Sequence, residues 1–349
     1  MELLVNFEVN LLVTLLVFTL FSFSLTPLII KIAQKHKILD FPKQMHKSHH
    51  HPTPYLGGFS IIIPILIATI LSPVVYPESR QIFFQALSLI CVPIFLSLVG
   101  LLDDLKNLGP FRKLAFQFVA TLMTIAIFIQ QDLTIVIFPN SFMNVLATLL
   151  WFIFIVNAMN FFDNLDGAAV GFVIVVSFTT LVLSYANNQK FFTVFCAALM
   201  GCSTGFLYWN KSEARIYLGD SGSLFLGLLL ATLIVQLKPT GNLQQTSILV
   251  PLMMISTLAV DTFVALQSRI FARRSPFYGA QDHLSHRLLL LGYSKKKTLK
   301  VLMTMTLYFN ILAVVSHFID SNLIPGVLAI WLSSIALVTR FFLRIKISY

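Results

Sequence analysis

Eleven long apolar stretches run through this chain, and each could cross a lipid bilayer as a helix. The 349 residues are 57% hydrophobic and 11% charged, which is far from the composition of a soluble domain. We predict an all-α polytopic membrane protein with about 11 transmembrane helices in a single domain, 1–349. The expected spans are residues 8–30, 59–75, 82–102, 114–130, 143–159, 168–186, 191–208, 222–238, 247–268, 300–319 and 323–342.

The distribution of basic residues predicts the orientation of these helices. If the N-terminus lies outside, 21 of the 24 Lys and Arg residues fall on one face of the membrane. Cytoplasmic loops are enriched in Lys and Arg. We therefore expect an N-terminus outside and a cytoplasmic C-terminus, in the cell's inner (plasma) membrane. The net charge of +10 follows from this topology, so we expect no nucleic-acid partner.

Four polar clusters interrupt the apolar stretches, and the predicted topology places all of them on the cytoplasmic face. Polar and acidic groups are costly beside hydrocarbon, so such clusters usually mark function. A common face predicts one site that gathers phosphates and a divalent metal. The clusters are Asp103-Asp104, residues 157–167 (NAMNFFDNLDG), residues 219–222 (GDSG) and residues 283–287 (HLSHR).

The acidic clusters predict a nearby cation. Asp103 and Asp104 are adjacent and repel each other, and Mg²⁺ shared with substrate phosphates would hold both ionised. Alternatively, one carboxylate is a base, or the pair lies at the start of the helix that holds Lys113. Asp220 either binds the metal at a phosphate-binding helix N-terminus or caps that helix.

A second cluster has a regular spacing. Asn157, Asn160, Asp163 and Asp166 recur at every third residue, which predicts one polar stripe along a helix. Amides can bind uracil or sugar edges, and carboxylates can bind ribose hydroxyls or metal-bound water. The alternative is a polar helix end with Asx caps.

The longest predicted cytoplasmic loop contains His283, His286 and Arg287. Arginine donates to phosphate in a planar geometry, and histidine titrates near neutral pH. Two histidines at this spacing could instead bind zinc, although no third ligand is nearby. Asp261 is the one acid well inside a predicted span, where it serves either function or a structural pair. The tract 49–51 (HHH) is expected to be a solvated loop rather than a metal site.

Together these segments resemble the polyprenyl-phosphate N-acetylhexosamine-1-phosphate transferases. The resemblance covers roughly residues 40–295 and follows the family's order. It is carried by PTPYLGG at 52–58, GLLDDLKNLGPFRKLAFQ at 100–117, NAMNFFDNLDGAAVG at 157–171, ARIYLGDSGSLFLG at 214–227, DT at 261–262 and SPFYGAQDHLSHRLLLLG at 275–292.

The resemblance implies transfer of a HexNAc 1-phosphate from a UDP-sugar to undecaprenyl or another polyprenyl phosphate, with release of UMP. Mg²⁺ is the expected cofactor, and Mn²⁺ is expected to substitute. The product would initiate a lipid-linked cell-envelope glycan such as O-antigen or teichoic acid. GlcNAc is the expected sugar; FucNAc, QuiNAc or MurNAc-pentapeptide are alternatives, and a membrane transporter is a more distant one. The expected partners are both substrates, the lipid bilayer and a second copy in a homodimer.

The resemblance also implies residue roles. Asp220 is the expected Mg²⁺ ligand, with Asn160 as a further candidate. The expected catalytic residues are Asp103, Asp104, Lys113 and Asp220. The expected substrate-binding residues are Asn157, Asn160, Asp163, Asp166, His283, His286 and Arg287, of which the last three match the loop associated with sugar recognition.

Three residues depart from the common pattern of this family. Asn164 stands where many members have glycine, Ser285 replaces a frequent histidine, and Tyr55 replaces a frequent arginine. The triple-histidine signature of the phospho-MurNAc-pentapeptide translocase is absent from the last large loop, which disfavours that enzyme.

Overall fold

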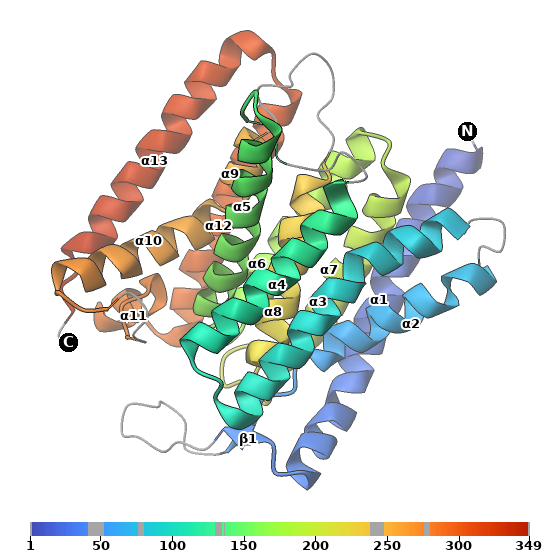
Figure 1. Ribbon diagram of the computed structural model, residues 1–349, viewed down its shortest axis with the longest axis horizontal. Helices are drawn as coiled ribbons and strands as arrows, with labels where there is room; N and C mark the ends of the chain where they lie inside the picture. The colour runs from blue at the N-terminus through green and yellow to red at the C-terminus, as the bar shows by residue number, and fades with distance from the viewer. Residues whose placement is uncertain are drawn as a thin grey trace.

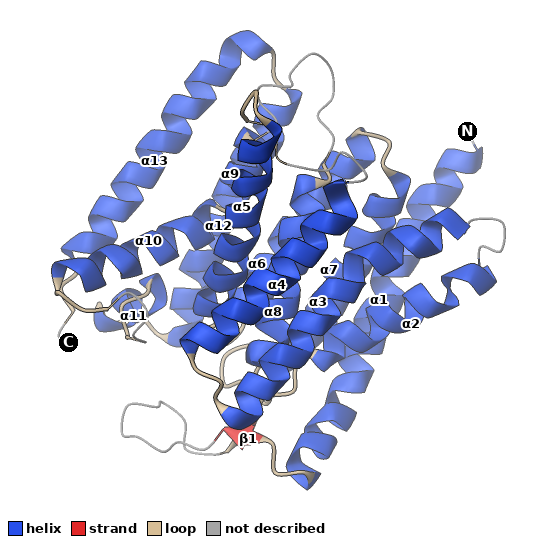
Figure 2. Cartoon of the chain, in the orientation of Figure 1, coloured by secondary structure: helices blue, strands red, loops and turns tan. Residues whose placement is uncertain are grey.

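The computed structural model describes residues 2–40, 52–75, 80–129, 135, 137–237, 248–275 and 280–347; the histidine tract 49–51 lies outside these residues. The described chain is a helical bundle with one short hairpin, so the predicted all-α class is confirmed (Figures 1 and 2). The elements are α1 (Glu2–Lys35), β1 (Leu39–Asp40), β2 (Thr53–Pro54), α2 (Phe59–Val75), α3 (Arg80–Lys106), α4 (Pro110–Ile129), α5 (Ser141–Phe162), α6 (Ala168–Ala186), α7 (Lys190–Asn210), α8 (Gly219–Val235), α9 (Leu249–Met254), α10 (Ser256–Phe271), α11 (Leu284–Leu290), α12 (Lys295–Phe318), η2 (Ser321–Leu323) and α13 (Ile324–Arg344).

The long apolar helices occur where the sequence predicts membrane spans. Within the described ranges, eight helical segments are long and apolar enough to cross a membrane: α1, α3, α4, α5, α6, α7, α12, and η2 together with α13. Two shorter apolar helices, α2 and α8, lie at two further predicted spans. The chain is therefore a polytopic membrane protein.

The predicted span 247–268 is not one continuous helix. It is divided into α9 and α10 at Ile255, which has φ −93° and ψ 3°. The Ser256 hydroxyl lies 2.9 Å from the carbonyl oxygen of Leu252, four residues back, and accepts a hydrogen bond from Trp331 Nε1 at 2.8 Å. Such side-chain bonds to the preceding turn bend helices. Figure 1 shows α10 turning away from the direction of α9.

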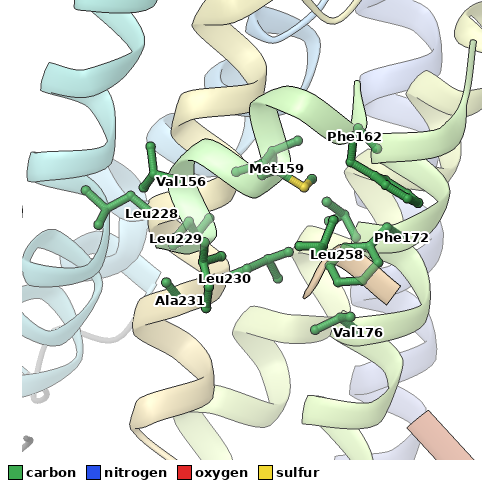
Figure 3. Packing of buried hydrophobic residues seen from close by; sticks show 14 of the residues in the cluster. Val156, Met159, Phe162, Phe172, Val176, Leu228, Leu229, Leu230, Ala231 and Leu258 are labelled. Carbon is green, nitrogen blue, oxygen red and sulfur yellow. The ribbon is translucent and has the colours of Figure 1, made fainter. Parts of the chain in front are cut away.

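The helix α8 forms the centre of the bundle, with every residue from Ser221 to Ile234 buried. Figure 3 shows residues 228–231 of α8 packed near Val156 of α5. The two helices approach closely at Gly227, where an added Cβ would lie 3.0 Å from the Cα of Val156. Helices in lipid associate through close packing of small residues rather than through hydrophobic exclusion. This packing fixes the position of α8 and of the acidic residue at its start.

The PTPYLGG segment holds the loop that leads into α8. Tyr217 donates its backbone N–H to the carbonyl oxygen of Pro54 at 2.8 Å, and its own carbonyl oxygen accepts from the N–H of Gly57 at 2.9 Å. The N–H of Gly58 donates to Leu218 at 2.9 Å. In Figure 1 this hairpin lies at the same end of the bundle as the end of α3, the starts of α4 and α8, and α11. The four polar clusters therefore share one end of the molecule.

The excess of basic residues at this end predicts that it faces the cytoplasm. Asn188 and Lys211 are exposed residues that flank the two ends of α7, so they should lie on opposite sides of the membrane. In a chain with the exposed Cys91 changed to serine, a membrane-impermeant maleimide should label Asn188→Cys in intact cells. Lys211→Cys should react only after permeabilisation. The reverse pattern would contradict the predicted orientation.

Candidate active site

The two aspartates at the end of α3 have different partners: Asp104 bonds to the start of α8, and Asp103 pairs with Lys113. Asp104 accepts hydrogen bonds from the backbone N–H groups of Asp220 (3.1 Å) and Ser221 (3.3 Å) at the start of α8. A carboxylate here satisfies unpaired N–H groups and interacts favourably with the helix dipole. Gly100 permits the close approach, because a Cβ there would overlap the carbonyl oxygen of Asp220. Asp104 thus caps α8 and occupies the N–H groups of Asp220 and Ser221.

Lys113 of α4 is at the centre of the charged groups. Its Nζ lies 3.1 Å from Oδ2 of Asp103 and forms a second ion pair with Asp220. It also donates to Oδ1 of Asn160 at 3.1 Å. Asp103 lies in the last turn of α3, and its Oδ1 accepts from the N–H of Leu108, in the turn before α4, at 2.7 Å. The structure therefore brings predicted residues of three helices, α3, α5 and α8, to the ammonium group on α4.

The helix α5 contributes two amides beside this centre. Asn160 Nδ2 donates to Oδ1 of Asp220 at 2.8 Å and to the hydroxyl of Ser223 at 2.9 Å. Asn157 Nδ2 donates to Oε1 of Gln117 at 2.8 Å. Ser223 and Gln117 are absent from the predicted site, although Gln117 is recognisable in the sequence as a polar residue within an apolar span. Both act on the site through the asparagines.

The predicted polar stripe is helical only for the two asparagines, because α5 ends before Asp163. A turn follows, and it ends at Gly167 with a φ of 80°, a conformation that glycine adopts without steric cost. Asn210 fixes this turn by accepting a hydrogen bond from the N–H of Gly167 at 3.1 Å. Asp166 accepts from the N–H of Ala214 at 3.4 Å. Both aspartates line the same cavity as Asn160 of α5.

Two cavities meet at Asn160, which lines both of them. The larger cavity, about 460 Å³, is lined by Asp40, Tyr55, Asp104, Asn160, Asp163, Asn164, Leu165, Asp166, Asn210, Tyr217, Leu218, Gly219 and Asp220. The smaller cavity, about 260 Å³, is lined by Asp103, Asn107, Gly109, Pro110, Phe111, Lys113, Leu114, Asn157, Asn160 and Phe161. Two ligands could thus approach the same charged centre from different sides.

Carboxylates dominate the larger cavity, whose described lining includes five aspartates and neither lysine nor arginine. Burial, and then repulsion from Asp220, Asp104 and Asp166, raises the pKa of Asp163 well above its usual value. An anionic ligand such as a diphosphate would be repelled from this cavity unless a cation accompanied it. The larger cavity therefore calls for a cation beyond the protein's own Lys113.

The oxygen atoms around Lys113 are of the type that Mg²⁺ prefers. This ion usually keeps several waters and is held by one or two carboxylates together with substrate phosphates. Asp220 supplies a carboxylate and Asn160 an amide oxygen. Over the described parts of the chain, no group of three or more His, Cys, Asp or Glu side chains could hold a metal alone. The donors fit Mg²⁺ that is bound jointly by the protein and a phosphate ligand.

His283 belongs to a buried network between α10 and α11. Its Nδ1 lies 2.7 Å from Oδ2 of Asp261, and its Nε2 lies 3.4 Å from Arg269. Arg269 makes two 2.7 Å hydrogen bonds to Asp282. Asp261 also accepts from the N–H of Leu284 at 2.8 Å. Both ring nitrogens of His283 are engaged, so the zinc alternative does not fit, and Asp261 has the structural-pair role.

Arg287 differs from the expectation. Its buried guanidinium donates to the carbonyl oxygens of Asp282 (3.0 Å), Phe342 (2.8 Å) and Ile345 (2.6 Å), and to the hydroxyl of Ser268. These bonds fasten α11 to the end of α13. The structure therefore gives Arg287 a structural role in place of the expected contact with the sugar.

His286 has a different environment from its neighbours. Its Nδ1 is buried and has no hydrogen-bond partner within the described ranges. Burial, and then the proximity of His283, lowers the pKa of His286 to about 4, so its ring is neutral at physiological pH. A neutral imidazole can donate from one nitrogen and accept at the other. His286 is therefore still able to bind a ligand, as the sequence predicts.

The role of Lys113 as the counter-ion of two aspartates can be tested by removing only its charge. Lys113→Met leaves Asp103 and Asp220 without their cation. With Asp220 28% exposed, the loss should be about 2–3 kcal/mol, below that of a fully buried pair. Thermal unfolding in EDTA should show the loss, and Mg²⁺ should restore more stability to this variant than to the wild type. The exposed Lys300→Met is the control. Equal responses to Mg²⁺ in all three proteins would contradict this role.

The structural role of Arg287 predicts that Arg287→Ala lowers the melting temperature. Each buried carbonyl group left without its donor costs about 1–3 kcal/mol. The affinities for UMP and for a UDP-sugar should weaken together, because the change acts on the fold. Inhibition by UMP and UDP-sugar kinetics, measured on one preparation, provide the comparison. A selective loss of UDP-sugar binding with an unchanged melting temperature would restore the sugar-contact interpretation.

Comparisons with known proteins agree with this arrangement. Glycosyl transferase family 4 matches residues 86–238, which extend from α3 past α8. The undecaprenyl-phosphate alpha-N-acetylglucosaminyl 1-phosphate transferase of Thermotoga maritima is 30% identical over 297 residues, which cover 85% of this chain and 88% of that protein.

Two other relatives align over similar lengths. The probable undecaprenyl-phosphate N-acetylglucosaminyl 1-phosphate transferase of Bacillus subtilis is 28% identical over 320 residues, 90% of this chain and 85% of that protein. The phospho-N-acetylmuramoyl-pentapeptide-transferase of Staphylococcus epidermidis is 26% identical over 312 residues, 82% and 93% of the two chains. The family match and these near-complete alignments show that this chain belongs to glycosyl transferase family 4.

Proposed function

We propose that this protein transfers GlcNAc 1-phosphate from UDP-GlcNAc to a polyprenyl phosphate, such as undecaprenyl phosphate, and releases UMP. The active site faces the cytoplasm, where UDP-sugars are made, and the lipid product initiates a cell-envelope glycan. The names of the Thermotoga and Bacillus relatives support this donor group and acceptor. The single observation that carries the proposal is the Lys113 centre at the junction of two cavities.

The two cavities suit two different phosphate ligands. The larger one offers the rings of Tyr55 and Tyr217 and the carboxylate of Asp166. Nucleobases stack on aromatic side chains, and carboxylates accept hydrogen bonds from ribose hydroxyls. The smaller one is lined by Phe111 and Leu114 next to Lys113, which suits a phosphate carried on an isoprenoid chain. We assign the UDP-sugar to the larger cavity and the lipid phosphate to the smaller one.

The reaction brings two anions together. An oxygen of the lipid phosphate forms a bond to the β-phosphorus of the UDP-sugar, the bond from this phosphorus to the bridging oxygen breaks, and UMP leaves with the electron pair. The attacking phosphate is already largely ionised at neutral pH, so a strong base is not needed. Bound Mg²⁺ would neutralise charge on the transferring phosphate.

Each residue of the centre has a task in this scheme. Lys113 neutralises charge between the two phosphates, and Asp103 orients Lys113. Asp220 would hold the cation that accompanies the diphosphate, and Asn160 orients Asp220. Asp104 positions Asp220 through the cap on α8, where its two carboxylate oxygens accept backbone hydrogen bonds.

The direct test is UMP release by the purified protein with undecaprenyl phosphate and a panel of UDP-GlcNAc, UDP-GalNAc and UDP-MurNAc-pentapeptide. We expect release from UDP-GlcNAc that requires both the lipid phosphate and Mg²⁺, with Mn²⁺ as a substitute. Undiminished release in excess EDTA would contradict the metal requirement. Release without lipid phosphate would contradict the transfer, and a preference for UDP-MurNAc-pentapeptide would contradict the assigned sugar.

The task of Asp220 can be tested separately. Asp220→Asn keeps the shape of the side chain but removes the charge that holds the cation. Turnover should fall by about 10²–10³-fold, as when a transition-state electrostatic contact is lost, while the melting temperature in EDTA should fall less than for Lys113→Met, because Lys113 keeps its pair with Asp103. The exposed Asp320→Asn is a control with the same chemical change. Wild-type turnover by Asp220→Asn would remove Asp220 from the mechanism.

A further inference from the structure

The ammonium group of Lys113 contacts the same oxygen atoms that would bind a divalent cation. Its Nζ pairs with Oδ2 of Asp220 and lies 3.1 Å from Oδ1 of Asn160. These two atoms are the carboxylate and amide oxygens whose chemistry fits Mg²⁺. A third oxygen, Oδ2 of Asp103, lies 3.1 Å from the same Nζ. A lysine ammonium has three N–H donors, so three oxygens of the described chain are enough to engage all of them.

Both carboxylate oxygens of Asp220 are engaged in this arrangement. Oδ2 pairs with Lys113, and Oδ1 accepts from Nδ2 of Asn160 at 2.8 Å. A carboxylate oxygen has more than one lone pair, but an ammonium and a divalent cation on the same oxygen would repel each other strongly at such short range. The amide donor carries no net charge and has no such conflict with a cation. The contact between Lys113 and Asp220 is therefore the one that cation binding would break.

The orientation of Asn160 does not depend on Lys113. Its Nδ2 donates to Oδ1 of Asp220 at 2.8 Å and to the hydroxyl of Ser223 at 2.9 Å, and these two bonds fix the direction of the carboxamide. Its Oδ1 accepts from Lys113. Withdrawal of the ammonium would thus free this oxygen and one oxygen of Asp220 in a single step, with both side chains already in position to bind a cation.

The two sets of partners of Lys113 belong to different cavities. Asp220 lines the larger cavity, whereas Asp103 lines the smaller one together with Lys113 itself. Asp103 is anchored independently, because its Oδ1 accepts from the N–H of Leu108 at 2.7 Å. An ammonium that leaves Asp220 would therefore keep its pair with Asp103 and remain in the smaller cavity. Its freed N–H groups would then be available to an anion bound there.

We propose that Lys113 and the divalent cation exchange with each other at Asp220 and Asn160, and that this exchange couples the two cavities. Cation binding with the UDP-sugar in the larger cavity would release the ammonium to the lipid phosphate in the smaller one. Such coupling is reciprocal, so a phosphate that draws Lys113 away from Asp220 must also strengthen cation binding. Binding in one cavity thereby favours binding in the other. The assignment of ligands to the cavities rests on the proposed function.

The test measures Mn²⁺ binding rather than turnover. The electron paramagnetic resonance signal of free Mn²⁺ gives its affinity for the purified full-length protein, with and without farnesyl phosphate as a short isoprenoid phosphate. Titrations without protein correct for Mn²⁺ bound by farnesyl phosphate alone. In the wild type, farnesyl phosphate should tighten Mn²⁺ binding by about 5- to 150-fold, the usual range for coupled sites. Asp220→Asn should bind Mn²⁺ weakly under both conditions, because it lacks the charged ligand.

Lys113→Met should bind Mn²⁺ about 10-fold or more tightly than the wild type when no other ligand is present, because the competing charge is gone. Farnesyl phosphate should then change this affinity little. UDP, whose diphosphate binds the metal directly, should tighten Mn²⁺ binding in both proteins. Arg112→Met removes the same charge from the neighbouring, exposed position and should keep the wild-type behaviour. Lys113→Gln also removes the charge and keeps the test valid if Lys113→Met fails to fold.

Three results would overturn the inference. Farnesyl phosphate could leave the Mn²⁺ affinity of the wild type unchanged, it could tighten Mn²⁺ binding equally in Lys113→Met, or Lys113→Met could bind Mn²⁺ no more tightly than Arg112→Met. A wild type that transfers the sugar phosphate but shows no coupling would overturn the exchange alone. A wild type that shows the coupling but releases UMP from none of the UDP-sugars would overturn the proposed function and leave the exchange intact.

Discussion

The site depends on the balance between one ammonium group and the carboxylates that surround it. Lys113 is paired with Asp103 and Asp220 and bonded to Asn160, so it joins α3, α4, α5 and α8. This pairing offsets the repulsion between acids drawn from different helices. It leaves the adjacent, larger cavity strongly acidic, because the remaining aspartates have no basic residue in its described lining. A site of this kind can accept a diphosphate only together with a further cation. The charges of the site therefore support the proposed metal-dependent transfer.

The bundle holds these charges in place through close backbone contacts. Gly100 lets α3 approach the start of α8, and Asp104 then caps that helix. Gly58 donates to the loop before α8 from the other side. These contacts require small residues and a carboxylate at fixed positions, and they explain why the motifs of the sequence combine glycine with acids. The same segments that bear the chemistry thus also build the scaffold, so changes to them must be examined for folding as well as for turnover.

The sequence predicts those features that depend on local pattern. Hydrophobicity gives the helices, and regular spacing brings Asn157 and Asn160 to one face of α5. Features that depend on tertiary contacts cannot be predicted from local sequence patterns. The break at Ile255 is stabilised by Trp331, far along the chain. In the sequence, Arg287 is a candidate phosphate ligand. In the structure, its guanidinium instead donates hydrogen bonds to carbonyl oxygens at the end of α13. A hydrogen bond from the hydroxyl of Ser285 to Oδ1 of Asn164 links positions that the sequence shows only as two separate departures.

The most direct measurement is the structure of the protein with UDP-GlcNAc and Mn²⁺, in which the metal is located by its anomalous signal. The account predicts one Mn²⁺ bound by the carboxylate of Asp220 and by the diphosphate, with the β-phosphate next to Lys113 and the uridine in the larger cavity. Metal bound instead between Asp163 and Asp166, with the β-phosphate remote from Lys113, would contradict it.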